Sequence, residues 1–503
     1  MGFIDNIVAV LSPEAAYRRE AYRRAYEELK SDYDAGSYDK SNRNWRVSNT
    51  SAELTDRYSR DGVRARARDL ERNSDIMNSV VGAFKRNVVG GGYHVQVKTE
   101  DEELNKQIEK AWKKWCKKQN CDVTGTQSLN QIIRMAVERK KIDGGILFVK
   151  RYTNVGFVPF QLQMIEVDEL DSGTVQPKKA GNKVVGGIEY NAYNKPVGYF
   201  IRQYDVDGYS MRDPVYVDAK DVIFYFTKRR PSQLREMSDM APTITRIRDI
   251  NEFMTAVSVK ERIMACLSIF IKKVLPTTGI GRQNGAGSSD RVSYDGKMLT
   301  PGMIKELNAG DEIQVVNPSG QGTDATSFTK LQQRLIGSGQ GISYEATSRD
   351  MSESNYSSAR QGMIEDDLTY KDDRELLIEV LDEIYETFII SAVLCGAVSI
   401  PKFWNEKDRY LAHEWIQEPK PWIDPYKESN ANKIALQTGQ KTFKQIAAEN
   451  GRDWRSQIDD MAEVLEYGNS KGIDLGGVLF GIKESEPKPD DDEGGGGKSG
   501  KEE

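Results

Sequence analysis

The segment from Ser358 to Leu394 has an apolar pattern of helical period that no proline interrupts. Leu377, Leu381, Ile384 and Phe388 recur at spacings of three and four residues, which predicts one buried face of an amphipathic helix. At about 1.5 Å per residue, these roughly 37 residues would span on the order of 55 Å. A helix of that length is longer than a single small domain needs.

The length and charge of the chain narrow the class of protein further. Its 503 residues predict two to four domains at roughly 100 to 200 residues each. The hydrophobic fraction of 38% and the charged fraction of 29% indicate a protein with a real but polar core. A net charge of −6 argues against a simple DNA-coating protein, which would usually be basic. Any contact with nucleic acid must therefore depend on local patches.

Cysteine usage and hydropathy indicate reduced thiols and no membrane anchor. Four cysteines in a chain of this length do not form a disulfide scaffold. Cys116 and Cys121 lack a CxxC spacing or a nearby histidine pair, so we expect no metal site there. Asp5 interrupts the short apolar run near the start, which makes a poor signal peptide. No apolar run reaches the roughly 18 residues that span a bilayer.

The common catalytic and cofactor motifs are missing. No P-loop, Rossmann fingerprint, GxSxG elbow or HExxH helix occurs, so we expect no cofactor and no bound metal. The two histidines, His94 and His413, are interpreted as structural or surface residues. The acidic run at 365–367 lies on the long predicted helix and is interpreted as a solvated face. The alternative is a Mg²⁺-dependent phosphodiester hydrolase that uses Glu365, Asp366 and Asp367.

The order of predicted elements indicates an α+β protein. Residues 1–50 read as an N-terminal arm, and 51–240 combine helices with closely spaced strands, typical of a mostly antiparallel sheet. A long helix is predicted over 241–269, followed by a Gly- and Ser-rich segment at 270–326. A second helix over 327–347 contains three glycines that weaken it.

The remainder of the chain begins with a short polar segment at 348–357, which contains the sequence "RDMSESNYS". The long helix is then assigned to 358–398. Residues 399–483 hold a proline-rich connector and three short helices, one of which Thr442 is expected to cap. The acidic, Gly-rich tail at 484–503 is expected to be disordered.

Three ordered blocks of this sequence resemble the lambda-type phage portal proteins. They are "VRARARDLERNSDIMNSVVGAFKRNVVGGGYHVQV" from Val63, "GISYEATSRDMSESNYSSAR" from Gly341 and "EPKPWIDPYKESNANKIALQTGQKTFKQIAAENGRDW" from Glu418. Three blocks in the same order are more specific than one short motif. Residues 1–45 and 277–296 show no motif of that family.

The resemblance implies a portal fold that assembles into a ring, usually of twelve subunits. The wing would be 51–240, with helices and a mostly antiparallel sheet. The stem helices would be 241–269 and 327–347, joined by a small clip at 270–326. The segment 348–357 would be a tunnel loop, 358–398 would return through the wing, and 399–483 would form the C-terminal wing and the helical crown.

The same resemblance implies a function and its partners. The ring would be a channel without catalytic activity at one capsid vertex, through which double-stranded DNA is packaged and ejected. It would dock the large subunit of the terminase motor, then head-completion or tail proteins, and it would contact major capsid or scaffold proteins. It would be a virion protein that is assembled in the cytoplasm of a bacterial host, with no membrane partner.

Two sets of residues are then candidates for contact with DNA. The tunnel loop is polar and nearly neutral, which suits a sliding contact rather than a clamp. Its residues are Arg349, Asp350, Met351, Ser352, Glu353, Ser354, Asn355, Tyr356 and Ser357. The alternative is a plain loop between helices. The basic residues of the first stem helix that could line the channel, or instead form salt bridges between subunits, are Arg246, Arg248, Lys260 and Arg262.

A third hypothesis is a monomeric DNA-binding adaptor, which would bind duplex DNA in a salt-sensitive way without forming a ring. Arg64, Arg66 and Arg68 of the "RARARD" sequence would serve such a protein. We favour contacts within a ring, or the surface of the wing, for these three arginines.

Overall fold

The computed structural model describes residues 12–28, 44, 47, 49–266, 270–273, 311–314, 325–417, 425–473 and 475. Two compact units are distinguished, and each is considered by itself. The smaller contains the residues up to Tyr58 together with Arg230–Gln233, and the larger contains Ser59–Arg229 and the chain from Leu234 onward. The tail predicted at 484–503 and most of the segment at 270–326 lie outside the described residues.

The described residues of the smaller unit include the helices α2 (Pro13–Glu28) and α3 (Ala52–Asp56). Pro13 occupies the first position of α2, where the missing N–H of proline costs nothing. At α3, the Ser51 side chain accepts a hydrogen bond from the Leu54 N–H. The segment that the sequence indicated as an arm thus includes a 16-residue helix.

The larger unit begins with helices α4 (Arg60–Asn73) and α5 (Asp75–Phe84), which Ser74 separates. The Ser74 hydroxyl accepts a hydrogen bond from the Met77 N–H and so caps α5. A π-helical turn, η2 (Lys85–Val89), follows, and Gly90 ends it at a φ of 57°. Strand β1 (Tyr93–Val97) and helices α6 (Glu102–Trp115) and α7 (Lys118–Cys121) come next.

The strands of this unit pair in the antiparallel sense, which confirms the α+β class. One sheet has the order β3-β2-β8, with β2 (Gly145–Arg151) between β3 (Gln161–Ile165) and β8 (Val222–Phe226). A second sheet has the order β4-β5-β6-β7. Its strands are β4 (Lys183–Val185), β5 (Ile188–Tyr190), β6 (Pro196–Ile201) and β7 (Val215–Asp218), and the 3₁₀ turns η3 (Val167–Glu169) and η4 (Ala219–Asp221) flank it.

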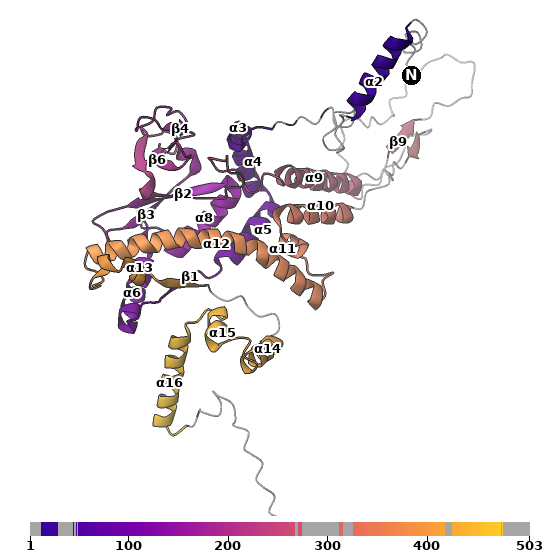
Figure 1. Ribbon diagram of the computed structural model, residues 1–503. Coiled ribbons are helices and arrows are strands. Elements are labelled where there is room, and N and C mark those ends of the chain that lie inside the picture. Colours follow the sequence, from indigo (N-terminus) through magenta and orange to yellow (C-terminus); the bar gives the residue numbers. More distant parts are fainter. Residues whose placement is uncertain are drawn as a thin grey trace, which may run out of the picture. The chain divides into compact units, whose positions relative to one another are not determined.

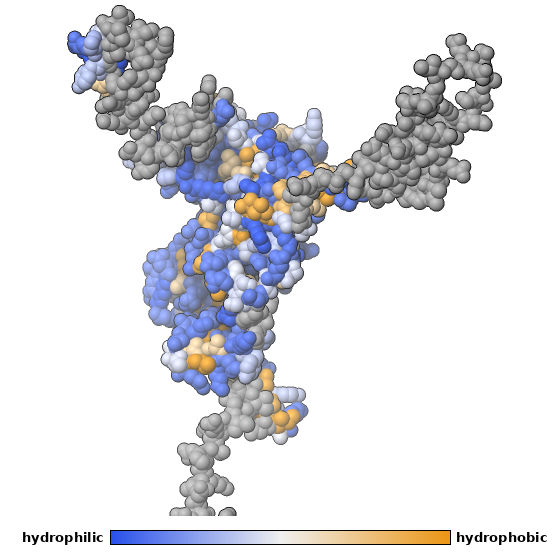
Figure 2. All heavy atoms as spheres, turned by 90° about the vertical axis from the view of Figure 1, so that its right-hand side faces the viewer, coloured by the Kyte–Doolittle hydropathy of each residue, from blue (hydrophilic) through white to orange (hydrophobic). Residues whose placement is uncertain are grey.

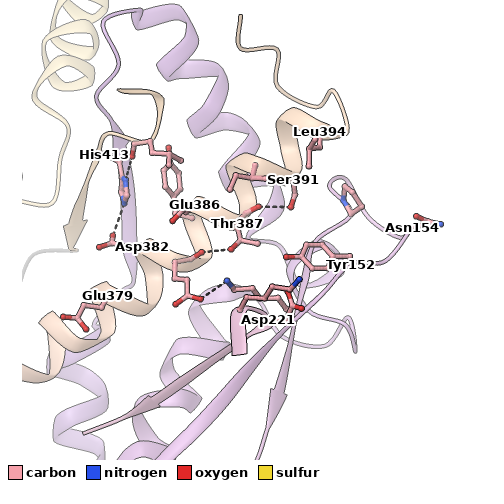
Figure 3. A pocket seen from close by; sticks show the side chains of 17 residues that line it. Tyr152, Asn154, Asp221, Glu379, Asp382, Glu386, Thr387, Ser391, Leu394 and His413 are labelled. Atoms are coloured by element: carbon pink, nitrogen blue, oxygen red, sulfur yellow. Dashed lines mark hydrogen bonds and ion pairs between the residues drawn. The ribbon is translucent and has the colours of Figure 1, made fainter. Parts of the chain in front are cut away.

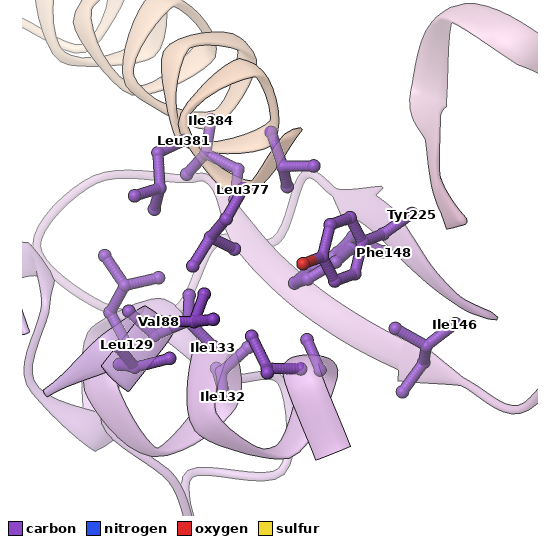
Figure 4. Close-up of a cluster of buried hydrophobic side chains, with 14 of the residues drawn as sticks. Val88, Leu129, Ile132, Ile133, Ile146, Phe148, Tyr225, Leu377, Leu381 and Ile384 are labelled. Atoms are coloured by element: carbon purple, nitrogen blue, oxygen red, sulfur yellow. The ribbon is translucent and has the colours of Figure 1, made fainter. Parts of the chain in front are cut away.

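Two helices contribute many of the buried side chains of the core. Helix α8 (Leu129–Asp143) packs on β2, and α12 (Tyr356–Leu394) crosses the unit beside it (Figure 1). Figure 4 shows Leu377, Leu381 and Ile384 of α12 facing α8 and the sheet. These three side chains are at most 1% exposed, so the apolar face that the sequence predicts is the buried one.

Helices α9 (Ile244–Cys266) and α10 (Ala325–Gln340) lie side by side (Figure 1). The rings of Phe253 and Phe328 meet across them with centroids 4.4 Å apart. Strands β9 (Phe270–Lys273) and β10 (Asp311–Gln314) form an antiparallel pair between the two helices in sequence. They are the described part of the predicted clip.

After α12, the turn η5 (Phe403–Asn405) and helix α13 (Lys407–Tyr410) lead to β11 (His413–Gln417). Strand β11 pairs with β1, so the segment that follows α12 is hydrogen-bonded to a strand near the beginning of the larger unit. Helices α14 (Pro425–Gln437), α15 (Phe443–Glu449) and α16 (Trp454–Ser470) follow. Thr442 caps α15 as predicted, since its hydroxyl accepts from the Gln445 N–H at 3.2 Å. Among the helices that the structure describes, none has the length and apolar character needed to cross a bilayer.

Candidate functional site

The sequence predicted one continuous helix over 327–347, but the structure divides this segment into two helices. Helix α10 ends at Gln340, Gly341 adopts a φ of 70°, and a separate short helix α11 (Tyr344–Ser348) follows. The three glycines of the segment had already weakened the prediction, and Gly341 supplies the left-handed conformation that breaks the helix. The candidate loop therefore follows α11 rather than a long stem helix.

Asp366 of α12 fixes the beginning of α11. Its carboxylate accepts from the Ser343 N–H at 2.6 Å and from the Ser343 hydroxyl at 2.7 Å. Asp366 is buried, and the neighbouring Asp367 pairs with Arg374 at 2.9 Å. The interpretation of this acidic run as a solvated face is therefore wrong for Asp366, which joins two helices.

The loop itself is held by hydrogen bonds to α10 and α11. Glu353 forms ion pairs with Lys330 at 2.6 Å and Arg334 at 3.7 Å. Ser354 donates to Glu345 at 2.7 Å. The charge of Glu353 is thus balanced by α10, and not by the loop's own Arg349.

Two further loop residues are fixed locally. Asp350 accepts from the Tyr344 hydroxyl at 3.2 Å and from the Ser352 N–H at 3.0 Å. Hydrogen bonds from the side chain and backbone of Ser352 hold the pKa of Asp350 below its ordinary value. Met351, in contrast, is 57% exposed, so it is a free apolar contact in an otherwise bonded loop.

The end of the loop is a helix cap. Asn355 accepts from the Ser358 N–H at 2.8 Å, and the Ser358 hydroxyl accepts in turn from the Asn355 N–H at 3.1 Å. Helix α12 begins at Tyr356, so Tyr356 and Ser357 belong to the helix rather than to the predicted loop. The capping box explains the boundary, because Asn is a preferred N-cap residue.

The basic residues of α9 differ in their surroundings. Arg246 donates to Gln332 of α10 at 3.0 Å, and Arg248 pairs with Asp249 and Glu252 of its own helix. Lys260 and Arg262 are exposed, and among the described residues no carboxylate pairs with either of them. The salt bridges of Arg248 thus lie within one helix, whereas the sequence-based alternative was a bridge between subunits.

The "RARARD" arginines have a role that the sequence analysis missed. Arg64 is buried and pairs with Asp168 at 2.9 Å and Glu236 at 3.0 Å. Arg68 pairs with Asp143 and Asp168, both at 2.6 Å. These two arginines join α4 to later segments of the unit, whereas Arg66 is exposed.

A groove with a volume of about 1370 Å³ runs along the second half of α12 (Figure 3). Its charged side chains are largely paired, as Lys150 is with Glu383 at 2.8 Å. The His413 ring lies 3.0 Å from Asp382, to which the Trp415 indole also donates. Burial alone would raise the pKa of Asp382, but these two hydrogen bonds hold it below its usual value. Both ring nitrogens of His413 are engaged, one with the Leu411 carbonyl and one with Asp382, which indicates a structural role for this histidine.

Within the described part of the chain, no group of three or more His, Cys, Asp or Glu side chains is placed to hold a metal ion. Cys116, Cys121 and Cys395 are free thiols, and burial raises the pKa of Cys121 to about 12. Such a thiol is a poor nucleophile and metal ligand at neutral pH.

Comparison with known proteins identifies the family. Residues 38–374 match the family described as "Phage portal protein, lambda family". The chain belongs to this family, and it is a portal protein of the head–tail connector, a component of a phage particle.

Individual relatives agree with this assignment. A "Probable portal protein" of Halomonas phage phiHAP-1 is 25% identical over 450 residues, which cover 86% of each chain. "Portal protein B" of Escherichia phage lambda is 18% identical and covers 78% of this chain and 81% of its own. A chain from the neck of an empty gene transfer agent particle is 15% identical, with a TM-score of 0.41 over 77% of this chain and 93% of that chain. That last likeness is too distant to carry an argument.

Proposed function

We propose that this portal protein assembles into a closed ring, of about twelve subunits, whose central channel passes double-stranded DNA. The match over residues 38–374 to the portal family carries the proposal. Each protomer would contribute two different faces, because a ring of one chain closes by rotation through heterologous contacts. Exposed apolar side chains on helices of the larger unit, such as Leu335 of α10 and Ile364 and Leu368 of α12, suit such faces.

Within the ring, residues 51–240 would form the wing, α9 and α10 the stem, and 270–326 the clip. Residues 399–483 would form the C-terminal wing and crown. The clip would dock the terminase motor during packaging and head-completion proteins afterwards, and other surfaces would meet capsid or scaffold proteins at one vertex. Assembly would take place in the host cytoplasm.

The loop at 350–355, which follows the end of α11 at Arg349, would line the channel, with exposed Met351 and Ser352 as transient contacts to DNA. Glu353 is paired with Lys330 and Arg334 of α10, so its charge is balanced within the chain, whereas Asp350 stays ionised while it accepts hydrogen bonds from Tyr344 and Ser352. Lys260 and Arg262 are the basic residues of α9 best able to face DNA.

The channel would act without catalysis. A phosphodiester hydrolase would need the carboxylates at 365–367 for Mg²⁺, but Asp366 is engaged by Ser343 and Asp367 by Arg374. This arrangement favours a structural role for both residues.

Mass photometry with negative-stain imaging of the purified protein tests the proposal. We expect a particle of about twelve times 56.8 kDa with a central hole. A chain that stays monomeric even with its capsid scaffold present, and that binds duplex DNA in a salt-sensitive way, would instead be the adaptor. Metal-dependent DNA cleavage that disappears in Asp366→Asn would establish the hydrolase.

A further inference from the structure

Two arginine side chains of the larger unit meet above Gly82 of α5. Arg86 comes from the turn η2, and Arg349 is the residue that ends α11. A Cβ atom placed on Gly82 would lie 3.0 Å from Nη1 of Arg86 and 3.8 Å from Nη2 of Arg349. Both guanidinium groups therefore occupy the space that the missing side chain leaves.

Neither guanidinium has a carboxylate partner among the residues that the structure describes. The nearby carboxylates are engaged elsewhere. The pairs are Glu345 with Ser354, Asp350 with Tyr344, Glu353 with Lys330, Asp366 with Ser343, and Asp367 with Arg374. This part of the chain thus brings two positive charges together and supplies no counter-ion.

The two charges repel each other. Burial lowers the pKa of Arg86 below its ordinary value, and the charge of Arg349 lowers it further. Arginine nevertheless stays protonated at neutral pH, so the repulsion persists until an anion arrives.

The backbone holds both residues in place. Arg349 adopts a φ of 60°, which is uncommon for a residue with a side chain, and its N–H donates to the Glu345 carbonyl at 2.8 Å. Arg86 follows α5, whose Val80, Val81 and Phe84 are buried. A left-handed non-glycine residue of this kind persists where its surroundings enforce it, often at a binding site.

We propose that Arg86 and Arg349 form a binding site for a carboxylate side chain of a second copy of this chain. Two guanidinium forks that converge on one point match the two oxygens of a carboxylate. The site would lie at the contact between neighbouring subunits, so the inference rests on the proposed ring.

The surroundings favour a protein partner over a DNA phosphate. Met351, two residues after Arg349, is 57% exposed, and Met363, two turns before Tyr370 on α12, is 45% exposed. The Tyr370 ring contacts Phe84, the residue directly before the turn η2 that contains Arg86. Methionine and arginine are both enriched at protein interfaces. Figure 2 turns the side with α10, α11 and the beginning of α12 toward the viewer, and hydrophobic residues gather there among hydrophilic ones.

The contact between subunits stays in place while DNA moves, so a carboxylate bound there strengthens the ring without opposing the passage of DNA. Paired guanidinium groups that faced the channel would instead exchange phosphate contacts as the DNA slides past them.

The variants Arg86→Gln and Arg349→Gln test the site, with Lys113→Gln on the exposed face of α6 as a control. We expect each variant to leave the Tm of the isolated protomer unchanged or slightly higher, because a repulsion is removed. On dilution, rings of each arginine variant should dissociate at a protein concentration at least about tenfold higher than the concentration at which wild-type rings dissociate. A lower protomer Tm with an unaffected ring would assign both arginines a merely internal role and overturn the proposal.

The carboxylate can be located with Arg349→Lys. Rings mixed from ¹⁵N-labelled and unlabelled copies of this variant would be treated with a zero-length carbodiimide and analysed by mass spectrometry. We expect an amide bond between position 349 of one copy and an acidic peptide of the other isotope. Cross-links confined to one copy, or none, would contradict the proposal.

Two further outcomes separate the hypotheses. Double-variant rings (Arg86→Gln with Arg349→Gln) of wild-type stability that lose affinity for a short DNA duplex would assign the site to DNA and overturn the carboxylate. A wild-type protein that never forms a ring would reject the proposed function and this inference together.

Discussion

At the scale of single residues, four buried charges join three segments of the larger unit. Lys140 and Lys141 of α8 meet Asp239, which precedes α9, and Asp373 of α12. The Lys140 ammonium lies 3.0 Å from Asp239 and 2.7 Å from Asp373, and its side chain is 1% exposed. This cluster ties α12 and the segment that precedes α9 to α8.

We expect Lys140→Met to destabilise the protein by about 3 kcal/mol, because it leaves buried carboxylates short of a partner. Lys113→Met, on the exposed face of α6, should change stability by less than about 0.5 kcal/mol. Chemical denaturation of the two variants would measure the difference. Equal effects would show that Lys141, together with Arg229 on Asp239, can balance both aspartates.

The same cluster predicts how stability depends on pH. Burial alone would raise the pKa of Asp373, but the two lysines hold it below its ordinary value of 3.8. The contribution of Asp373 to the free energy of unfolding is therefore present above pH 3.8 and is lost as the pH falls below that value. Burial alone would lower the pKa of Lys140, but Asp239 and Asp373 raise it above 10.5, so its contribution is lost only at higher pH. Asp373→Asn should therefore flatten the acid limb of the stability curve. An unchanged acid limb would contradict the role of this pair.

Gly144 and Gly181 have nearly the same φ, so a comparison of the two separates the free-energy cost of an unfavourable φ from that of a steric clash. Gly144 has a φ of 92° and Gly181 a φ of 90°. A Cβ on Gly144 would lie 2.4 Å from the Met237 carbonyl carbon, whereas nothing lies within 4 Å of one on Gly181. Gly181→Ala should cost about 1 kcal/mol, and Gly144→Ala about 3 kcal/mol or more, since backbone must move. Thermal unfolding of the pair checks this, and equal losses would exclude a steric effect.

The sequence could not reveal these charge contacts, because the partners are far apart in the chain. Lys140 and Lys141 look like the ordinary basic end of a helix, and Asp373 lies 233 residues beyond Lys140. Arg64 and Arg68 looked like surface residues for the same reason. Local patterns predict helices, but they carry no information on which distant charges meet.

At the scale of elements, the sequence predicted most helices and strands, because their apolar period and caps are local. The break between α10 and α11 was missed as a boundary, although Gly341 was noted as a weak point. The break combines a local cause, the left-handed Gly341, with a tertiary one, the bonds from Ser343 at the N-cap of α11 to Asp366 of α12. The pairing of β11 with β1 is likewise long-range and left no local signal.

The bond between Asp366 and Ser343 predicts a local effect on α11. Asp366→Ala should raise amide hydrogen exchange over residues 344–348 and destabilise the protein by about 2 kcal/mol, because two donors lose their buried acceptor. Asp366→Asn keeps one acceptor oxygen and should lose less. Hydrogen-exchange mass spectrometry compares the two variants, and identical protection to wild type in both would show that α11 is held by packing alone.

At the scale of the whole molecule, the loop before α12 must satisfy two demands in the proposed ring. It has to begin a long helix, which Asn355 does by capping α12, and it has to offer a surface to DNA, which the exposed Met351 does. Because Asn355 has a structural task, replacing it changes helix stability as well as any DNA contact.

A test of the channel loop must therefore keep the cap intact. We expect Asn355→Ser combined with Tyr356→Ala to form rings of normal mass, because serine also caps helices well. The same variant should package or retain less DNA if the loop touches it, whereas Asn355→Ala alone should lower stability by about 1 kcal/mol. DNA filling of assembled particles, measured beside ring mass, separates the two effects. Normal filling by the capped double variant would show that the loop is only a connection between helices, and the exposed Lys260 and Arg262 of α9 would then be the residues of the stem to test for DNA contact.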